Sequence, residues 1–472
     1  MRSRTLTSIL FGAAILGALL APRLPALLHT GRPSDPKIGG GFDRAPTAAQ
    51  QGEGALRLRA DLDHTVIAMG QSSEVSLVIE VTAAPGRGAA TAAPVHVALV
   101  LDTSGSMVEE DRIGMAQRAA NALADRLRPA DSLALVTFDD QAWLRLPRGP
   151  VLNPGLFHDV VAGLSPGGGT NLYDGLSRGF AELSSPSLEG VKRVVLLSDG
   201  EANIGVTEPE QIKALAAARA SEGVGLSTLG VGLAFNEDLL ASLADVGGGR
   251  YAYADQRGEL EERFLSEVDA LAATVAREAT LEVRLAAGDR VERLYGYGAD
   301  EIAPDQGGFR VYLGDIGEGQ RRRVVARVRL SGDGADPGEQ GRIAARTRLR
   351  YSDVASGQSV ATEGEVRVRI SGQEDEIASS LREEDARTAA MAEAASAMEA
   401  SAQQWAEGQV SEARQTLQRA LDALSSAPTG GAPAPAMPEL EQQLQQLDEA
   451  TDGAERRRAV IQAKEAARVY TR

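Results

Sequence analysis

Residues 96–107 of the chain read HVALVLDTSGSM, an unbroken apolar run that stops at an aspartate and is followed by two serines. A run this rich in valine and leucine is typical of a strand that is buried on both faces of a sheet. In open α/β sheets, ligands bind at the carboxyl ends of such strands. We therefore expect Asp102, Ser104 and Ser106 to present oxygen ligands there, and oxygen ligands favour Mg²⁺, Mn²⁺ or Ca²⁺ over zinc or copper.

Two later stretches supply further oxygen ligands in similar settings. Residues 167–172 read GGGTNL and place Thr170 after three glycines, while residues 194–200 read VVLLSDG and place Asp199 after a second buried-strand pattern. Together with D-x-S-x-S at the first stretch, they resemble the metal-ion-dependent adhesion site of von Willebrand factor type A domains. The resemblance covers roughly residues 95–276, a length that suits a single domain.

The resemblance implies a fold, a cofactor and a kind of partner. The fold is α/β, with a Rossmann-like, doubly wound and mainly parallel sheet. Five side chains would hold Mg²⁺, or Mn²⁺ or Ca²⁺ in its place: Asp102, Ser104, Ser106, Thr170 and Asp199. In that family an acidic residue of the partner protein often fills the remaining coordination position. The implied function is therefore non-catalytic, a cation-dependent protein-recognition module for adhesion or assembly, of the bacterial exported or membrane-associated type.

Each of these residues also has an ordinary structural explanation. An aspartate or serine at a strand end can cap a helix, which would account for the polar residues of 102–106. Thr170 could cap the helix that the pattern predicts directly after it, and Asp199 could belong to a common turn. A structural scaffold with an empty site therefore remains an alternative. The metal site is the favoured interpretation because the three stretches occur together and in order.

Composition narrows the classes of function. Asp plus Glu number 66 against 49 for Lys plus Arg, and this net charge of -17 argues against nucleic acid as a partner, because phosphate binding requires a basic surface. The chain has no cysteine, which excludes disulfides, zinc–thiolate sites and cysteine nucleophiles. A hydrophobic content of 43% is ample for the cores of two or three domains, and an aromatic content of 4% means that those cores are mainly aliphatic.

The first residues predict export. Arg2 and Arg4 precede an apolar run over residues 9–21, which is the pattern of an export signal. The run is short for a membrane span of about 20 residues, and no clear small-x-small cleavage site follows it. Residues 1–28 are therefore either a cleaved signal peptide or an uncleaved anchor in the inner membrane that uses residues 6–21. We expect a periplasmic or cell-surface protein, with a Gly/Pro/Ala/Gln-rich linker at 29–54.

Hydrophobic periodicity divides the rest of the chain. Residues 55–93 and 279–372 contain short strands in which apolar residues alternate with arginine, as in an antiparallel β-sandwich with one wet face. Between them, residues 94–278 alternate strands and helices, which implies a mainly parallel sheet covered on both faces. The last helix of this central region is expected over Glu259–Ala276.

Residues 373–472 are rich in Ala, Glu, Gln and Arg and predict a helical tail. Its first helix is expected over Glu376–Ala402, and a Pro/Gly/Ala linker at 428–438 interrupts the helical pattern.

The strands that precede the central region are too few to bury a core alone, because an isolated hairpin is marginal in water. The ends of a compact domain often lie close together, so one domain can be inserted into another. We therefore predict that Leu56–Val81 pairs with strands from Ala279–Ile370 in one sandwich, with the central domain inserted between them.

Other chemistries fit the sequence less well. The alternative from a different class is a divalent-metal phosphoesterase, which would need a base or a basic phosphate clamp near Asp102 and Thr170; the sequence shows neither. A haloacid-dehalogenase-type phosphatase would need an aspartate where Ser104 stands, and a Walker loop would need a lysine between Gly167 and Thr170. The four histidines offer no Ser/His/Asp set.

Overall fold

The computed structural model of the chain describes residues 54–85, 93–185, 187–199, 201–233, 235–254, 259–298, 301–333, 338, 340–426, 436–449 and 453–471. All of them belong to one compact unit, residues 45–472. The export segment expected over residues 1–28 and the linker expected over 29–54 lie outside the described residues, except for Gly54. Within the described residues, no helix is long and apolar enough to cross a membrane.

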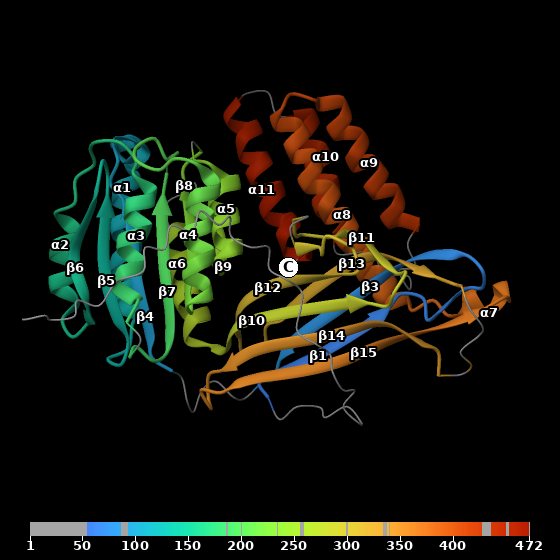
Figure 1. The fold of residues 1–472 in the computed structure, drawn as a ribbon. Helices are drawn as coiled ribbons and strands as arrows, with labels where there is room; N and C mark the ends of the chain where they lie inside the picture. The colour runs from blue at the N-terminus through green and yellow to red at the C-terminus, as the bar shows by residue number, and fades with distance from the viewer. Residues whose placement is uncertain are drawn as a thin grey trace, which may run out of the picture. The chain divides into compact units, whose positions relative to one another are not determined.

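A six-stranded sheet forms the centre of the central domain (Figure 1). Its strands lie in the order β6-β5-β4-β7-β8-β9, and neighbours are parallel except for the antiparallel β5–β6 pair at one edge. The strands are β4 (Val95–Asp102), β5 (Ser132–Phe138), β6 (Ala142–Pro150), β7 (Val191–Ser198), β8 (Val224–Val231) and β9 (Gly248–Ala254). Every residue of β4 is buried, as its apolar run predicts.

Helices cover both faces of this sheet. One apolar cluster packs α1, α2 and α6 against one face, and a second packs α3, α4 and α5 against the other. The helices are α1 (Arg112–Arg126), α2 (Pro154–Ala162), α3 (Leu172–Leu183), α4 (Pro209–Ser221), α5 (Glu237–Val246) and α6 (Glu259–Ala272). The predicted α/β, doubly wound fold is thus confirmed. Because β4 and β7 are parallel neighbours, their carboxyl ends lie side by side.

The strands before and after the central domain form two further sheets around one apolar core. The first has the order β1-β3-β13-β11, and the second has the order β12-β10-β14-β15-β2. Neighbours are antiparallel apart from the short β15–β2 pair. The strands are β1 (Leu56–Leu62), β2 (Val66–Ala68), β3 (Ser72–Ala83), β10 (Thr274–Leu285), β11 (Arg290–Leu294), β12 (Gly308–Gly317), β13 (Arg321–Ser331), β14 (Arg342–Asp353) and β15 (Ser359–Ser371).

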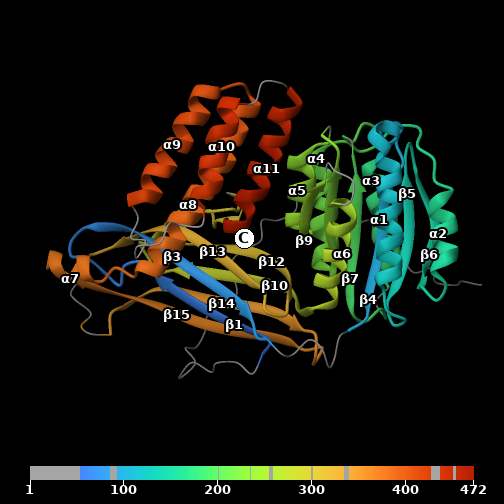
Figure 2. The same cartoon turned by 180° about the vertical axis from the view of Figure 1, so that it is seen from behind.

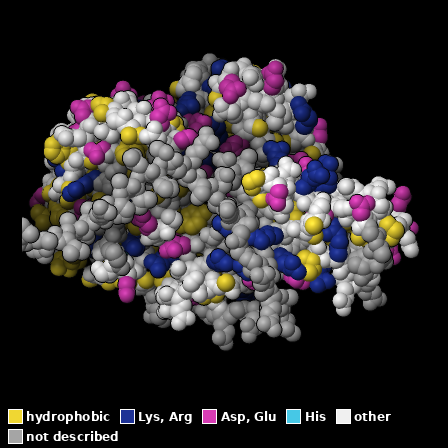
Figure 3. Space-filling model, in the orientation of Figure 1, with side chains coloured by type: hydrophobic (Ala, Val, Ile, Leu, Met, Phe, Trp, Pro, Cys, Tyr) yellow, Lys and Arg dark blue, Asp and Glu magenta, His cyan; other side chains and the backbone are white. Residues whose placement is uncertain are grey.

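The pairing predicted between the early and the late strands is present. β3 is hydrogen-bonded to β13 along its whole length, from Thr82 opposite Arg321 to Ser72 opposite Ser331. The central domain is therefore inserted into the sandwich, and two chain crossings connect them. Lysine and arginine side chains gather over the sandwich on the face shown in Figure 3, in agreement with the alternation of arginine and buried residues along β14.

The last helix of the central domain is shorter than its periodicity predicts. The helix expected to reach Ala276 ends at Ala272, and β10 begins at Thr274. Thr274 and Val275 are β-branched and favour a strand, and Thr274 pairs directly with Gly317 of β12. Pairing with the sandwich therefore overrides the helical pattern at this boundary.

The first helix of the tail is divided in two. The helix expected over Glu376–Ala402 appears as α7 (Glu374–Ser379) and α8 (Glu383–Ala406). Between them, Leu381 forms an antiparallel β-bridge with His64 in the sandwich. This long-range hydrogen bonding explains why the helical periodicity, which is continuous in the sequence, does not give a continuous helix.

Three more helices complete the tail, α9 (Val410–Ser426), α10 (Met437–Glu449) and α11 (Gly453–Thr471). Helices α8–α11 share an apolar core that includes the fully buried Trp405. α8 also packs on the sandwich through Ala389 and Ala392, and α11 lies beside α5 in both ribbon views (Figures 1 and 2). Through Ile461, α11 contributes to the apolar cluster that covers one face of the central sheet.

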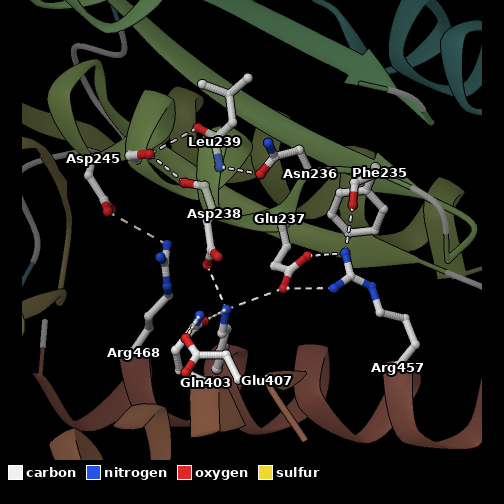
Figure 4. A network of polar contacts seen from close by, with 12 residues as sticks. Phe235, Asn236, Glu237, Asp238, Leu239, Asp245, Gln403, Glu407, Arg457 and Arg468 are labelled. Carbon is white, nitrogen blue, oxygen red and sulfur yellow. Dashed lines mark hydrogen bonds and ion pairs between the residues drawn. The ribbon is translucent and has the colours of Figure 1, made fainter. Parts of the chain in front are cut away.

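Charged side chains fasten α11 to α5, as Figure 4 shows. Glu237 is 4% exposed and accepts hydrogen bonds from Arg457 and Lys464, each at 3.2 Å. Lys464 also donates to Asp238 at 2.7 Å, and Arg457 donates to the carbonyl oxygen of Phe235 at 2.8 Å. Because Glu237 is buried, it depends on both cations for the balance of its charge.

Replacing Arg457 with alanine should loosen the tail from the central domain. The change leaves Glu237 buried with one cation instead of two. Since the Arg457 side chain is 34% exposed, we expect a loss of about 2 kcal/mol rather than the full cost of breaking a buried pair. Thermal unfolding and limited proteolysis of residues 436–471 would measure it. Arg456→Ala is the matched control, since Arg456 is exposed on the same helix turn. Equal effects of the two variants would contradict the proposed role of the Arg457–Glu237 contact in holding α11.

Candidate metal site

Asp102 lies at the carboxyl end of β4 and has no exposed surface. Its Oδ1 accepts a hydrogen bond from the backbone N–H of Ser104 at 2.8 Å, and its Oδ2 accepts one from the hydroxyl of Ser198 at 2.6 Å. Burial raises the pKa of Asp102 from 3.8 to about 6, although the hydrogen bonds from Ser198 and Ser104 act in the opposite direction. The carboxylate is thus fixed in place by neutral donors that do not balance its charge.

Asp199 follows β7 and is also fully buried. Its Oδ1 accepts a hydrogen bond from the hydroxyl of Ser106, and its Oδ2 accepts one from the guanidinium of Arg112, both at 2.8 Å. Because β4 and β7 are neighbours, the two buried carboxylates of Asp102 and Asp199 lie at the same edge of the sheet. Each repels the other, and the repulsion contributes to the raised pKa of Asp102.

Serine hydroxyls connect the two strand ends. The Oγ atoms of Ser104 and Ser106 are 3.1 Å apart, and the hydroxyl of Ser106 donates a hydrogen bond to Asp199. Ser104 is buried, whereas Gly105 is exposed and Ser106 is half-buried. Neither serine caps the short helix η1 (Gly105–Asp111): Ser104 occupies its cap position without a side-chain hydrogen bond to it. The helix-cap explanation therefore does not hold for Ser104.

The threonine loop packs directly on the loop that carries the serines. The backbone N–H of Gly105 donates to the carbonyl oxygen of Gly168 at 3.1 Å, and that of Gly167 donates to Thr103 at 2.8 Å. Gly168 has a φ of +75°, a conformation that favours glycine. Thr170 is buried, and its backbone N–H donates to the side chain of Asn203 at 2.8 Å.

Thr170 does not cap α3. The cap is Asn171, whose side-chain oxygen accepts a hydrogen bond from the backbone N–H of Asp174. The alternative explanation for Thr170 is therefore wrong. The structure brings Asp102, Ser104, Ser106 and Asp199 into one hydrogen-bonded chain, and it places the Thr170 loop against that chain.

These side chains fit a hard divalent cation by their chemistry. The donor set consists of carboxylate and hydroxyl oxygens, without nitrogen or sulfur. A fully buried carboxylate with neutral donors, such as Asp102, lacks the positive charge that would stabilise its ionised form. In the described part of the chain, no group of three or more His, Cys, Asp or Glu side chains could hold a metal ion. A cation here would therefore rely on the serine and threonine hydroxyls as well as the two carboxylates.

A family model for the von Willebrand factor type A domain matches residues 97–201, which include all five candidate site residues. The chain contains a von Willebrand factor type A domain. A von Willebrand factor type A protein from Catenulispora acidiphila shares the fold with a TM-score of 0.66, at 18% identity over 89% of this chain and 98% of that one. The ArnB paralog VWA2 from Sulfolobus acidocaldarius also shares the fold, with a TM-score of 0.58 and 17% identity over 89% of this chain and 99% of that one.

Proteins similar in sequence to this chain include bacterial and animal proteins. YfbK of Escherichia coli is 28% identical over 262 residues, which are 55% of this chain and 45% of that protein. Protein sll0103 of Synechocystis is 28% identical over 273 residues, 56% and 63% of the two chains. Human inter-alpha-trypsin inhibitor heavy chain H4 is 28% identical over 228 residues, which are 46% of this chain and 24% of that protein. The chain thus spans less than two thirds of the length of these relatives.

Arg112 is a member of the site that the sequence did not indicate. Apolar residues at helical spacing over residues 112–127 predict a helix, and Arg112 is merely the first residue of that pattern; the helix observed is α1 (Arg112–Arg126). One signal was present: a cation in the first turn of a helix opposes the helix dipole, so an arginine there needs acidic neighbours. In the type A domain these are Asp199 and the exposed Glu109 and Glu110, at 2.8, 3.3 and 3.6 Å.

Proposed function

We propose that the type A domain recognises a partner protein through a divalent cation. Five side chains would hold it: Asp102, Ser104, Ser106, Thr170 and Asp199. The observation that carries the proposal is the pair of fully buried carboxylates at neighbouring strand ends, Asp102 and Asp199, which are joined through serine hydroxyls. Oxygen donors of this kind favour Mg²⁺, with Mn²⁺ or Ca²⁺ as alternatives.

The partner would supply a carboxylate. Mg²⁺ prefers about six oxygens in an octahedron, and the loop at Gly105 and Ser106 reaches the surface. An acidic side chain of another protein can approach there and complete the coordination shell. Type A domains generally mediate protein–protein interactions, and the proposal extends that role to this chain through its own site.

The proposed role is binding rather than catalysis. The histidines in the described residues are engaged elsewhere: His96 contacts the hydroxyl of Ser132 at 2.7 Å, His158 pairs with Asp125 at 3.1 Å, and His64 lies in the sandwich. His96 is at the second residue of β4, away from the carboxyl end that carries the site. A phosphoesterase would need a general base near the two carboxylates, and these histidines do not supply one.

We further propose that the chain is exported and acts in the periplasm or at the cell surface. The support is the order of charge and hydrophobicity before residue 22, with Arg2 and Arg4 ahead of the apolar run. Fractionation of the source cells should find the protein in the periplasm or with the inner membrane. Recovery of the full-length chain as a freely soluble cytoplasmic protein would contradict export.

Calorimetric titration with Mg²⁺ and Mn²⁺ tests the proposed function. The full chain should bind one cation, and Ser106→Ala should weaken the binding because a hydroxyl ligand is lost. Thr103→Ser is the matched control in the same loop, since the Thr103 hydroxyl donates to the carbonyl oxygen of Phe138 at 3.0 Å and serine keeps that donor. Absence of cation binding by the unaltered chain would overturn the proposal.

A further inference from the structure

The guanidinium of Arg112 is a buried positive charge within the candidate site. Its side chain is 5% exposed, and Nη1 donates to Asp199 at 2.8 Å. Asp199 in turn accepts a hydrogen bond from the hydroxyl of Ser106. Asp199 is one of the five proposed ligands of the cation. Arg112 therefore contacts a carboxylate that would also contact the cation.

The surroundings of Arg112 show that its position is built into the fold. Gly232, after β8, has a φ of +76°, and a Cβ atom there would lie 2.6 Å from the Nε of Arg112. That Nε is buried without a hydrogen-bond partner. Directly before Arg112 in the chain, Glu110 and Asp111 both have positive φ values, of 52° and 60°, which costs free energy in residues other than glycine.

The buried charges of the site do not cancel once a cation is present. Asp102 and Asp199 carry two negative charges and Arg112 carries one positive charge, so a bound divalent cation would leave one positive charge in excess. Glu109 and Glu110 also approach Arg112, but they are 67% and 70% exposed, and solvent screens their effect strongly. An excess positive charge in a buried site attracts an anion and opposes a bare cation.

We propose that Arg112 couples the binding of the cation to the binding of the partner's carboxylate. It lowers the affinity of the site for the cation alone, and it raises the affinity of the cation-loaded site for an anionic oxygen ligand. This inference rests on the proposed function and deepens it, because it assigns the preference for an acidic partner to a named residue. Arg112 is a positioning and charge-setting residue, not a ligand of the cation.

The two binding events should then be reciprocal. If a carboxylate binds the loaded site more tightly because of Arg112, the cation must bind more tightly in the presence of a carboxylate by the same factor. In the absence of a carboxylate, the site would hold its cation weakly. The domain would therefore engage cation and partner together.

The test is a calorimetric titration of the full chain with Mn²⁺ in chloride and in acetate at equal ionic strength, where acetate is the carboxylate probe. The unaltered chain should bind Mn²⁺ about fivefold more tightly in acetate. Arg112→Met should bind Mn²⁺ in chloride about tenfold more tightly than the unaltered chain and lose the acetate effect. Arg112→Lys keeps the charge and should keep the acetate effect.

Arg112→Gln is the second variant, in case Arg112→Met does not fold. Glutamine is neutral but can still donate a hydrogen bond to Asp199, and this variant should bind Mn²⁺ as Arg112→Met does. If both neutral variants bind Mn²⁺ no more tightly than the unaltered chain, or if they keep the acetate effect, the role of Arg112 is refuted while the proposed function stands. If the unaltered chain binds no Mn²⁺ in either buffer, both proposals fail together.

Discussion

Replacing Asp102 with asparagine is expected to abolish divalent-cation binding and, at the same time, to stabilise the cation-free protein. Loss of a residue that only orients a metal ligand typically costs 10- to 100-fold in affinity, so loss of a charged ligand should cost at least about 100-fold. The shape of the site should survive. An asparagine oxygen can still accept the hydrogen bond from the N–H of Ser104, and its amide can donate to the hydroxyl of Ser198, which now faces Asp102 at 2.6 Å.

The stabilisation follows from the raised pKa of Asp102. The folded-state pKa is about 6 against 3.8, so the folded protein binds this proton more tightly than the unfolded chain does. The contribution of the protonated form to stability is complete below about pH 4, and it is lost as the pH rises through about 6. At neutral pH the buried charge therefore costs roughly 3 kcal/mol without a cation, and asparagine removes that cost.

Calorimetric titration with Mn²⁺ and thermal unfolding in a chelator at pH 5 and pH 7.5 would measure both effects. The variant should melt higher than the unaltered chain at pH 7.5, and the difference in melting temperature should be smaller at pH 5. Thr103→Ser again serves as the control. A variant that melts lower at pH 7.5 and still binds Mn²⁺ would show that Asp102 has only a structural role.

Ile79→Asp is expected to unfold the sandwich while leaving the type A domain intact. Ile79 has no exposed surface and lies in β3 between β1 and β13, opposite Ala60 and Val324. A single unpaired charge at that point should cost more than about 4 kcal/mol. The loss should extend to residues 279–370, because β3 supplies one wall of their core.

Hydrogen exchange with peptide resolution would measure this prediction. Protection should fall in the sandwich strands on both sides of the insertion and persist in β4, β5 and β7. Ser72→Asp places the same charge at an exposed position of the same strand, and it should change little. If Ile79→Asp leaves protection in residues 279–370 unchanged, the sandwich does not depend on the early strands.

Much of the central domain could be predicted because its signals are local. The apolar runs that end at Asp102 and Asp199 define buried strands, and parallel neighbours bring their carboxyl ends together. The meeting of the serine and threonine loops followed from the same reasoning. The sandwich could be predicted because the two strands expected before the central domain are too few to bury the apolar side chains of Leu77 and Ile79 alone.

Features that depend on long-range contacts could not be predicted. The bridge between Leu381 and His64 interrupts a helical pattern from more than three hundred residues away in the chain. The docking of α11 depends on Arg457 and Lys464, which in the sequence resemble any charged residues of a solvated helix. Arg112 was not predicted for the same reason, because its guanidinium reaches Asp199 and packs against Gly232, and both lie far from it in the sequence.

The most direct test of the central claim is a crystal structure of the full chain grown with Mn²⁺, with the metal located by its anomalous scattering. The account predicts one strong peak at the carboxyl edge of the central sheet, within about 2.1 Å of oxygen atoms from this site. The expected side chains are Asp102, Ser104, Ser106, Thr170 and Asp199, either directly or through one water. A fully ordered site with no peak, or a peak held by other residues, would contradict the account.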